Sequence, residues 1–188
     1  MSLTAERFDP EKWRRLEAPE RRARMSPAAL AALLAPGPDE TVVDIGCGTG
    51  YFAEGMSGAC RTYVGVDFSA QLLEVFRAKG LPGDIRLVRG LAFPLPLADA
   101  TADLVFHANL LHEVADPALF HRELFRVTKP GGRLFAIDWE ARETEGGPPL
   151  AKRISRERAA EAMRRGGLSD LAVHPLWDDW YVLGGRRP

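Results

Sequence analysis

The chain has 188 residues, 46% of them hydrophobic and 27% charged, which is the composition of one globular domain and excludes a disordered chain. Its 25 basic and 26 acidic residues give a net charge of −1, which argues against non-specific binding to nucleic acid or to an anionic membrane. Cys47 and Cys60 are too few for a disulfide framework or a four-thiolate zinc site, and no run of residues is apolar enough for a membrane span. We therefore expect a single cytoplasmic domain over residues 1–188, with reduced thiols.

The composition has one further bias, toward arginine and away from amides. The basic residues are 21 Arg and 4 Lys, and the chain has one Asn, Asn109, and one Gln, Gln71. Scarce amides suit a thermophilic protein, because Asn and Gln are chemically labile. A GC-rich genome, whose codons favour Arg, Ala, Gly and Pro, explains the same bias. Both interpretations stay open, and the bias makes Asn109 a residue to test.

The sequence predicts a helical cap over residues 1–35. Trp13 and Leu16 lie about one helical turn apart, which gives that helix an apolar face. Ser26 stands before a proline at the start of a second expected helix, 27–34, in the usual order of an N-cap and a first helical residue. We therefore expect short helices before the first strand.

Short apolar runs then alternate with helical segments. The expected strands lie at 41–45, 62–66, 85–88, 103–107 and 133–137. The expected helices lie at 51–57, 69–79, 117–128 and 155–165. Apolar strands between helices predict a parallel sheet that is buried on both faces.

The carboxyl-terminal tail changes this rhythm. Strands are expected at 171–177 and 180–184, separated only by Asp178 and Asp179. So short a connection joins antiparallel neighbours, because a parallel crossover needs a dozen or more residues. The predicted fold class is α/β, a doubly wound α-β-α sandwich with a mostly parallel, seven-stranded sheet and a C-terminal antiparallel hairpin.

The most informative motif is the glycine loop, residues 44–50, with the sequence Asp-Ile-Gly-Cys-Gly-Thr-Gly, directly after the first strand. Alternating glycines allow a tight turn and the close approach of a ligand, at the sheet edge where open parallel sheets bind ligands. The helix that follows directs free N–H groups toward that ligand. Residues 48–53 satisfy the looser form of the dinucleotide fingerprint, whereas no Gly-Lys-Ser/Thr follows, which excludes a P-loop.

Two acidic residues decide between the ligand classes. Asp44, at the end of the first strand, would repel a pyrophosphate and attract a cationic ligand. Asp67 ends the second strand, where a carboxylate can accept both hydroxyls of a ribose. Together they favour a nucleoside that carries a positive charge and no phosphates.

With Val66-Asp67 and the Lys-Pro-Gly-Gly run at 129–132, the glycine loop resembles the motifs of class I S-adenosylmethionine-dependent methyltransferases, nearest to the type 11, ubiquinone-biosynthesis-type branch. The resemblance covers about residues 36–140 and implies a Rossmann-like cofactor-binding core, followed by a cover loop, helix and hairpin over 141–188. It implies methyl transfer from S-adenosyl-L-methionine, with S-adenosyl-L-homocysteine as the product.

The resemblance also implies roles for single residues. The glycine loop approaches the methionine part of the cofactor, Asp67 holds the ribose, and Phe68 lies on the adenine face. The cofactor-binding residues implied in this way are Asp44, Gly46, Cys47, Gly48, Gly50, Tyr51, Asp67, Phe68, Gly90, Leu91, Ala92 and Asn109. For Cys47, the alternative is simple packing of a small side chain.

Leu91 departs from the family pattern. The family often has an Asp at this place, which accepts the adenine amino group, and Leu cannot accept a hydrogen bond. The loss of one such bond costs about 0.5–1.5 kcal/mol. Leu91 therefore also favours an alternative function, a non-catalytic module that binds S-adenosylmethionine or S-adenosylhomocysteine.

The residues after the fourth strand are candidates for catalysis. His112 is a candidate general base, since histidine can take a proton near neutral pH; the alternative is a residue that shapes the cofactor pocket. Asn109 is a candidate for contact with cofactor or substrate. His107, within a strand, is expected to be a packed core residue, and His121, beside charged neighbours on a helix, a surface residue.

Candidate substrate residues lie in the cover loop and the helical cap. Trp139 is expected to stack on a substrate or to pack in the core. Arg153 is expected to pair with a substrate carboxylate or to be a solvated arginine at a helix start. Trp13, with Phe8 and Tyr51, is expected to form the other wall. Because little of the chain remains for recognition, we expect a small-molecule acceptor.

A remote alternative is an NAD-dependent oxidoreductase. That function predicts no acid directly before the glycines, and more chain after the fifth strand for a catalytic site. The sequence has Asp44 before the glycines and a short tail after residue 137, so both expectations fail. The sequence predicts no metal site and no nucleic-acid partner.

Overall fold

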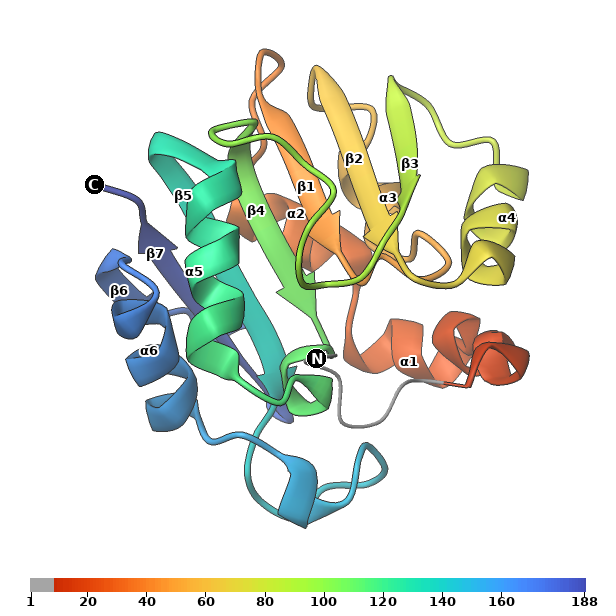
Figure 1. The fold of residues 1–188 in the computed structure, drawn as a ribbon. Coiled ribbons are helices and arrows are strands. Elements are labelled where there is room, and N and C mark those ends of the chain that lie inside the picture. Colours follow the sequence, from red (N-terminus) through yellow and green to blue (C-terminus); the bar gives the residue numbers. More distant parts are fainter. Residues whose placement is uncertain (1–8) are drawn as a thin grey trace. The chain divides into compact units, whose positions relative to one another are not determined.

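The computed structural model describes residues 9–188 (Figure 1). These residues fall into two compact units. We call residues 9–96 the amino-terminal unit and residues 97–188 the carboxyl-terminal unit, and describe each by itself. Phe8, expected in a wall of the substrate site, lies outside the described residues.

The amino-terminal unit begins with three short helices, as predicted. They are η1 (Pro10–Glu17), α1 (Pro19–Arg24) and α2 (Pro27–Leu34). Each starts with a proline, whose missing N–H is no loss in the first turn. The Ser26 hydroxyl accepts a hydrogen bond from the Ala29 N–H at 3.4 Å and caps α2.

Three parallel strands follow in the order β3-β2-β1. The strands are β1 (Thr41–Ile45), β2 (Thr62–Asp67) and β3 (Ile85–Arg89), and the helices between them are α3 (Ala53–Met56) and α4 (Ala70–Ala78). Every residue of β1 and β2 is buried, which confirms the prediction from their apolar sequences. Ile45 pairs with Val66, so β1 and β2 end together and the glycine loop emerges beside Asp67.

The carboxyl-terminal unit holds four strands in the order β4-β5-β7-β6. They are β4 (Ala102–Ala108), β5 (Thr128–Trp139), β6 (Ser169–Val173) and β7 (Trp180–Arg186). β4 and β5 are parallel, and β7 runs antiparallel to both β5 and β6, which confirms the predicted hairpin. The predicted two-residue connection is wrong, because β6 ends at Val173 and residues 174–179 form the connection; Pro175 has no N–H with which to continue the strand.

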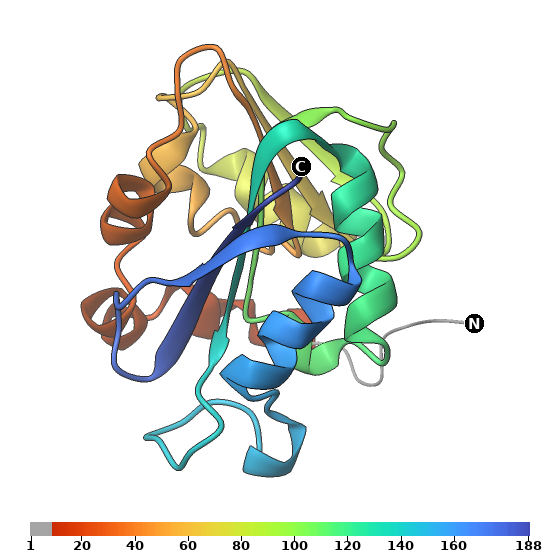
Figure 2. The same cartoon turned by 90° about the vertical axis from the view of Figure 1, so that its left-hand side faces the viewer.

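Two long helices lie side by side in this unit (Figure 2). They are α5 (Pro117–Val127) and α6 (Arg156–Arg165). The unit also holds two short 3₁₀ turns that the sequence did not predict, η2 (Leu111–Glu113) and η3 (Leu150–Lys152). Gly166 lets α5 and α6 approach each other closely, because a Cβ on Gly166 would lie 2.7 Å from the His121 Cβ. The prediction of His121 as a surface residue is therefore wrong, since its side chain is completely buried and Gly166, directly after α6, lies against it.

His107 and His121 form a buried pair. The Pro117 carbonyl accepts a hydrogen bond at 2.7 Å from His121 Nδ1, so His121 Nε2 is the bare nitrogen that faces His107 Nε2 at 3.5 Å. Burial lowers the pKa of His121 to about 4, although the bond to Pro117 opposes the shift, and burial also lowers the pKa of His107. The prediction of His107 as a core residue is confirmed, but its Nδ1 has no partner among residues 9–188.

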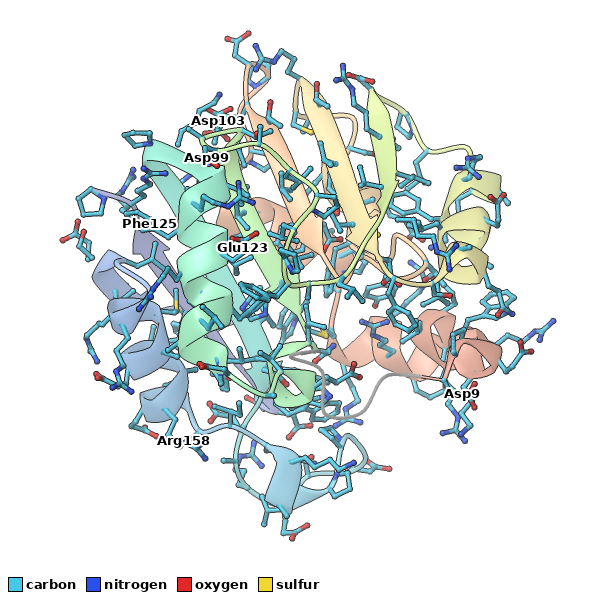
Figure 3. The ribbon with its side chains drawn as sticks, viewed as in Figure 1. Asp9, Asp99, Asp103, Glu123, Phe125 and Arg158 are labelled. Carbon is cyan, nitrogen blue, oxygen red and sulfur yellow. The ribbon has the colours of Figure 1, made fainter. Side chains whose placement is uncertain are left out.

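The amino end of β4 carries ion pairs on the surface (Figure 3). Lys129 Nζ lies 2.8 Å from Asp103, and Arg126 pairs with Asp99 at 2.6 Å and with Glu123 at 2.8 Å. Such exposed pairs contribute about 0–1 kcal/mol each. We infer that these residues stabilise the fold, in contrast to Asn109 and His112, which follow the opposite end of β4.

Three parallel strands in one unit, and four strands that end in an antiparallel hairpin in the other, agree with the mostly parallel sheet that the sequence predicts, and the α/β fold class is confirmed. Cys47 and Cys60 are both buried free thiols. Within residues 9–188, no helix combines the length and the apolar character that a membrane crossing requires.

Candidate functional site

The glycine loop turns sharply at the end of β1. Gly46, Gly48 and Gly50 all have positive φ, of 73°, 54° and 73°. A Cβ on Gly50 would collide with the Phe76 ring of α4. Glycine is therefore required at position 50, both for the backbone conformation and for the packing of the loop on α4.

The amides of the glycine loop are already used inside the unit. Gly46 and Cys47 both donate to the Val66 carbonyl, at 2.8 and 3.1 Å. The Gly48 amide donates to Asp67 Oδ2 at 2.9 Å, and the Gly50 amide to the Cys47 carbonyl at 2.9 Å. These four amides cannot cradle a phosphate, so the geometry disfavours a dinucleotide and favours a ligand that contacts the loop without phosphates.

Asp67 is held in place by backbone donors. Its Oδ2 accepts from Gly48, and its Oδ1 accepts from the Ser69 amide at 2.9 Å. Burial raises the pKa of Asp67, while hydrogen bonds from the amides of Ser69, Gly48 and Phe68 oppose that rise. Each carboxylate oxygen has a further lone pair, so Asp67 can still accept the two hydroxyls of a ribose.

Asp44 lies in the same buried cluster. Its Oδ2 accepts a hydrogen bond from the Tyr63 hydroxyl at 2.8 Å. Burial raises the pKa of Asp44 to about 7; the Tyr63 hydrogen bond opposes the shift, the charge of Asp67 adds to it, and the charge of Arg21 opposes it. A cationic ligand would favour the ionised form of this carboxyl group.

Cys47 packs within the same cluster. A Cβ on Gly65 of β2 would lie 2.9 Å from the Cys47 sulfur, so the thiol fills the space that Gly65 leaves free. Burial raises the pKa of Cys47 well above that of a free thiol. The Cys47 side chain is thus a buried thiol with no nucleophilic character.

The remaining predicted adenine-side residues follow β2 and β3. The Gly90 amide donates to the Asp67 carbonyl at 2.9 Å, and Arg89 Nε donates to the Phe68 carbonyl at 3.2 Å. Leu91 and Ala92 are half-buried just beyond β3. Their side chains offer an apolar surface and no hydrogen-bond acceptor.

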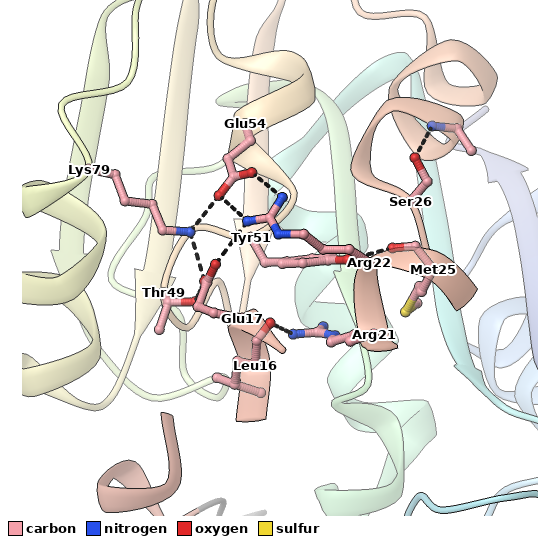
Figure 4. A network of polar contacts seen from close by, with 11 residues as sticks. Leu16, Glu17, Arg21, Arg22, Met25, Ser26, Thr49, Tyr51, Glu54 and Lys79 are labelled. Carbon is pink, nitrogen blue, oxygen red and sulfur yellow. Dashed lines mark hydrogen bonds and ion pairs between the residues drawn. The ribbon is translucent and has the colours of Figure 1, made fainter. Parts of the chain in front are cut away.

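The amino-terminal helices are tied to the glycine loop by charged residues that sequence reasoning missed (Figure 4). The Glu17 carboxylate of η1 accepts from the Thr49 hydroxyl of the loop and lies 2.7 Å from Lys79 Nζ. Lys79 also contacts Glu54 at 2.7 Å, and Arg22 of α1 pairs with Glu54 at 2.6 Å. Nothing in the local sequence marks this network, since its members come from the glycine loop and from helices that are separate in the sequence.

Tyr51 packs against the amino-terminal helices, and Trp13 is part of η1. The Tyr51 hydroxyl donates to the Met25 carbonyl at 2.7 Å, and the Arg21 guanidinium lies 4.1 Å from the centre of the Tyr51 ring. Trp13 is half-buried in η1, with the Arg14 guanidinium 4.9 Å from its ring. Tyr51 is therefore a packing residue for the helical cap, and Trp13 keeps an exposed surface.

In the carboxyl-terminal unit, His112 lies on η2 and contacts Asp138 of β5. His112 Nδ1 lies 2.8 Å from Asp138 Oδ1, and the His112 amide donates to Asp138 Oδ2 at 3.2 Å. Burial lowers the pKa of His112, but the hydrogen bond and charge of Asp138 outweigh it, so the net shift is upward. The pair has the geometry of a general base and the acid that orients it.

Asn109 follows β4 with a positive φ of 56°. Its amide donates to the Ile137 carbonyl at 2.9 Å, and its Oδ1 accepts from Trp180 Nε1 at 2.9 Å. An Asn side chain tolerates this left-handed backbone better than most residues, which gives a structural reason for the chain's single Asn.

Trp139 is enclosed by its own unit. Its ring centre lies 4.3 Å from that of Trp180, and the Arg153 guanidinium lies 5.2 Å from it. A Cβ on Gly147 would lie 2.8 Å from the ring, so the cover loop packs directly on it. Trp139 is half-buried, which supports the packing interpretation for the face that meets the loop.

The decisive comparison is with known protein families. A sequence profile described as a methyltransferase domain matches residues 43–136, which is half of the chain. The chain belongs to this methyltransferase family. The matched residues include the glycine loop, Asp67 and His112, and the resemblance to class I S-adenosylmethionine-dependent methyltransferases is confirmed.

Individual relatives agree with the family. An uncharacterized methyltransferase of Mycobacterium bovis is 34% identical over 129 residues, which are 68% of this chain and 50% of that protein. A demethylmenaquinone methyltransferase of Corynebacterium kroppenstedtii is 41% identical over 106 residues, 56% of this chain and 44% of that protein. The crystal structure of a SAM dependent methyltransferase from Aquifex aeolicus matches with a TM-score of 0.85 at 26% identity, over 95% of this chain and 98% of that one. The chain spans about half the length of the curated relatives it matches.

The amino-terminal unit of the chain fits the cofactor that its family implies. S-adenosylmethionine has a ribose with two free hydroxyls, a cationic sulfonium and no phosphate. Asp67 retains acceptors for the hydroxyls, Asp44 favours a cation, and the four bonded loop amides offer nothing to a phosphate. The adenine amino group finds no partner on the Leu91 side chain.

Arg153 organises the cover loop, which follows β5. The prediction of a solvated arginine is wrong, because the residue is only 8% exposed. Its guanidinium donates to loop carbonyls and one hydroxyl at 2.7–3.1 Å, and these acceptors belong to Glu140, Arg142, Thr144, Gly146 and Pro148. Oxygen atoms of the loop thus accept hydrogen bonds from the N–H groups with which Arg153 was expected to bind a substrate carboxylate.

We predict that Arg153→Met loosens the cover loop. The methionine keeps the apolar stem but leaves buried carbonyls without donors, which costs about 1–3 kcal/mol. Urea unfolding should show that loss, and limited proteolysis should cut within residues 140–150 faster than in the unchanged protein. Arg158→Met, on the exposed surface of α6, is the matched control. Equal stability and equal cleavage of the two variants would contradict the assignment.

Sequence reasoning missed Asp138 as a site residue, although a signal was present. An acidic residue near the end of a buried parallel strand pointed to Asp44 and Asp67, and Asp138 stands in the same place on β5. Its partner His112 was found because it follows β4, but the pairing depends on the fold of η2.

Proposed function

We propose that this methyltransferase domain transfers a methyl group from S-adenosylmethionine to a small-molecule acceptor. The observation that carries the proposal is the glycine loop, whose amides are bonded internally beside two buried carboxyl groups, Asp44 and Asp67. That arrangement suits a cationic nucleoside without phosphates. Family membership supports the same function.

In this proposal the amino-terminal unit holds the cofactor. Asp67 accepts the ribose hydroxyls, the glycine loop lies against the methionine part, Asp44 favours its positive charge, and Phe68 lies against the adenine. When bound, the cofactor supplies an electrophilic methyl group on a good leaving group. The main task of the protein is then to position the acceptor in line with that methyl group and to keep water away.

His112 is the proposed general base. A base is needed where the nucleophile of the acceptor is protonated at neutral pH, and His112 has the Asp138 contact that such a base requires. Asn109 and Trp139 are proposed to shape the surroundings of His112 from the same unit. The demethylmenaquinone methyltransferase among the relatives makes quinols the first acceptors to try.

Titration calorimetry tests the cofactor. We expect S-adenosylmethionine and S-adenosylhomocysteine to bind in the micromolar range and NAD to give no heat. Binding of NAD without binding of S-adenosylmethionine would replace the proposal with the oxidoreductase alternative. That alternative is disfavoured by the loop amides, which leave no cradle for a pyrophosphate.

A second candidate is a non-catalytic module that binds the same cofactor. Leu91 favours it, because the adenine amino group loses a side-chain acceptor there. Release of S-adenosylhomocysteine over a panel of quinols, phenols and amines separates the two functions. Turnover of any member supports the enzyme; tight cofactor binding with no turnover supports the module.

The proposal includes a setting for the protein. We propose one methyltransferase domain over residues 1–188 that acts in the cytoplasm, where the buried thiols of Cys47 and Cys60 stay reduced. A thermophilic source remains one explanation of the scarce amides, and a GC-rich genome the other.

A further inference from the structure

The His112–Asp138 contact also determines which ring nitrogen of His112 carries the proton. A carboxylate accepts hydrogen bonds and cannot donate them, so the contact at 2.8 Å places a proton on His112 Nδ1. Asp138 Oδ2 also accepts from the His112 amide at 3.2 Å, so one carboxylate holds both the ring and the backbone of the same residue. The Trp139 amide donates to Asp138 Oδ1 at 2.8 Å and holds the carboxylate itself.

The other ring nitrogen of His112, Nε2, is available to accept a proton. With Nδ1 protonated, neutral His112 has a bare Nε2 that can accept a proton. Among residues 9–188, Nε2 has no hydrogen-bond partner, and the side chain keeps 10% of its surface exposed. Asp138 is almost completely buried, so it can orient His112 but cannot reach a ligand in solution.

We propose that Asp138 is a positioning residue, which holds His112 with Nδ1 protonated so that Nε2 takes the proton of a neutral O–H or N–H nucleophile on the acceptor. The inference rests on the proposed function and names its substrate class. It excludes carbon nucleophiles that are already carbanions and oxygen nucleophiles that are already ionised, because neither has a proton to give.

The proton balance of this step is closed. His112 Nε2 takes the acceptor's proton as the acceptor oxygen or nitrogen bonds to the methyl carbon and the carbon–sulfur bond breaks. The cofactor, when bound, would supply the methyl group and leave as a neutral thioether, so the positive charge would reside on the His112 imidazolium. Asp138 stabilises that imidazolium by its negative charge and by the Nδ1 hydrogen bond. Solvent then receives the proton.

Three charged groups face His112 and set its titration. Asp138 on β5 and Glu113 on η2 favour the protonated ring, and Arg153 after η3 opposes it. Burial alone lowers the pKa, and Asp138 reverses the shift. Removal of the Asp138 charge should therefore lower the pKa of His112, while the fold of the unit is kept by an isosteric side chain.

Nitrogen-15 NMR of the imidazole rings tests the proposal in the full chain without any acceptor. In the unchanged protein we expect His112 to show the Nδ1–H tautomer and a pKa above 6.5, with the signal assigned by its loss in His112→Gln. In Asp138→Asn we expect the pKa to fall, because the charge that raises it is gone, and the tautomer to change, because the amide can donate to Nδ1. The matched control is Tyr181→Phe, opposite Asp138 in the β5–β7 register, whose hydroxyl has no partner among the described residues.

The outcomes separate this inference from the proposed function. An Nε2–H tautomer in the unchanged protein, or the same His112 pKa in Asp138→Asn, would overturn the role of Asp138. The tautomer decides even where the variant does not fold. Calorimetry with S-adenosylhomocysteine on the same samples tests the cofactor separately, and we expect equal affinity in the unchanged protein and in Asp138→Asn. Where an acceptor turns over, Asp138→Asn should lower kcat about a hundredfold and move the acidic limb of the pH profile to lower pH.

Discussion

Replacement of Asp67 by alanine should raise the Kd for S-adenosylhomocysteine at least tenfold. The carboxylate is the proposed acceptor of both ribose hydroxyls, and hydrogen bonds to a charged group contribute about 1.5–3 kcal/mol each. Its two oxygens are aimed by the amides of Gly48 and Ser69, at 2.9 Å each, so little reorganisation precedes binding. Titration calorimetry at fixed pH and salt measures the change directly.

Asp84→Ala is the matched control for this experiment. Asp84 is an exposed aspartate of the same unit, with contacts to Thr62 and Arg86 at 3.0 Å. It should leave the Kd unchanged. Circular dichroism and urea unfolding must show that Asp67→Ala still folds, because Gly48 loses a hydrogen-bond acceptor. A folded variant with unchanged affinity would refute the ribose role of Asp67.

The strands of this fold could be predicted because their sequences allow few alternatives. Five residues that follow a turn, apolar except for Thr41 and Asp44, fit a strand that is buried on both faces, and β1 covers the predicted residues. The last connection was mispredicted because the 174–177 segment is apolar enough for a strand, while Pro175 stops the pairing. The local sequence thus predicted where strands occur better than it predicted the residues at which they end.

Side-chain environments could be predicted only where they depend on local sequence. His121 stands beside Arg122 and Glu123, yet it is buried because Gly166 brings the end of α6 onto it. Arg153 precedes a helix as a solvated arginine would, yet five acceptors of a folded loop surround it. Both errors come from contacts between elements that are distant in sequence. The glycine loop was predictable because its chemistry is contained in seven consecutive residues.

Asp44 should affect stability and cofactor binding in opposite directions. Its pKa is about 7 in the folded protein and about 3.9 in an unfolded chain. The folded state therefore binds the extra proton, and the stability that this proton contributes at low pH is lost as the pH rises through 7. At pH 8 the buried carboxylate costs about 4 kcal/mol by this linkage. A protein keeps such a cost where the charge has a function, and a cationic cofactor supplies one.

Asp44→Asn should therefore stabilise the ligand-free protein at pH 8 and weaken its cofactor binding. The amide retains an acceptor for the Tyr63 hydroxyl, and the cost of its unpaired NH₂ group, about 1–3 kcal/mol, leaves a gain of about 2 kcal/mol in the free energy of unfolding. At pH 5, where Asp44 is protonated, that gain should disappear. His121 titrates in the opposite sense, with a pKa of about 4 folded and about 6.5 unfolded, so each comparison is between variant and unchanged protein at one pH.

Calorimetry completes the test of Asp44. A cationic cofactor lowers the pKa of Asp44, so binding near pH 7 should release a proton, and affinity should rise with pH up to about 7. The released proton appears as a dependence of the binding heat on the ionisation enthalpy of the buffer, and Asp44→Asn should lose it. Asp84→Asn, which alters an exposed carboxylate, should change neither quantity. Proton release that persists in Asp44→Asn would assign the charge recognition to another group, whereas its loss together with higher stability at pH 8 would establish Asp44 as a residue retained for binding at the expense of the fold.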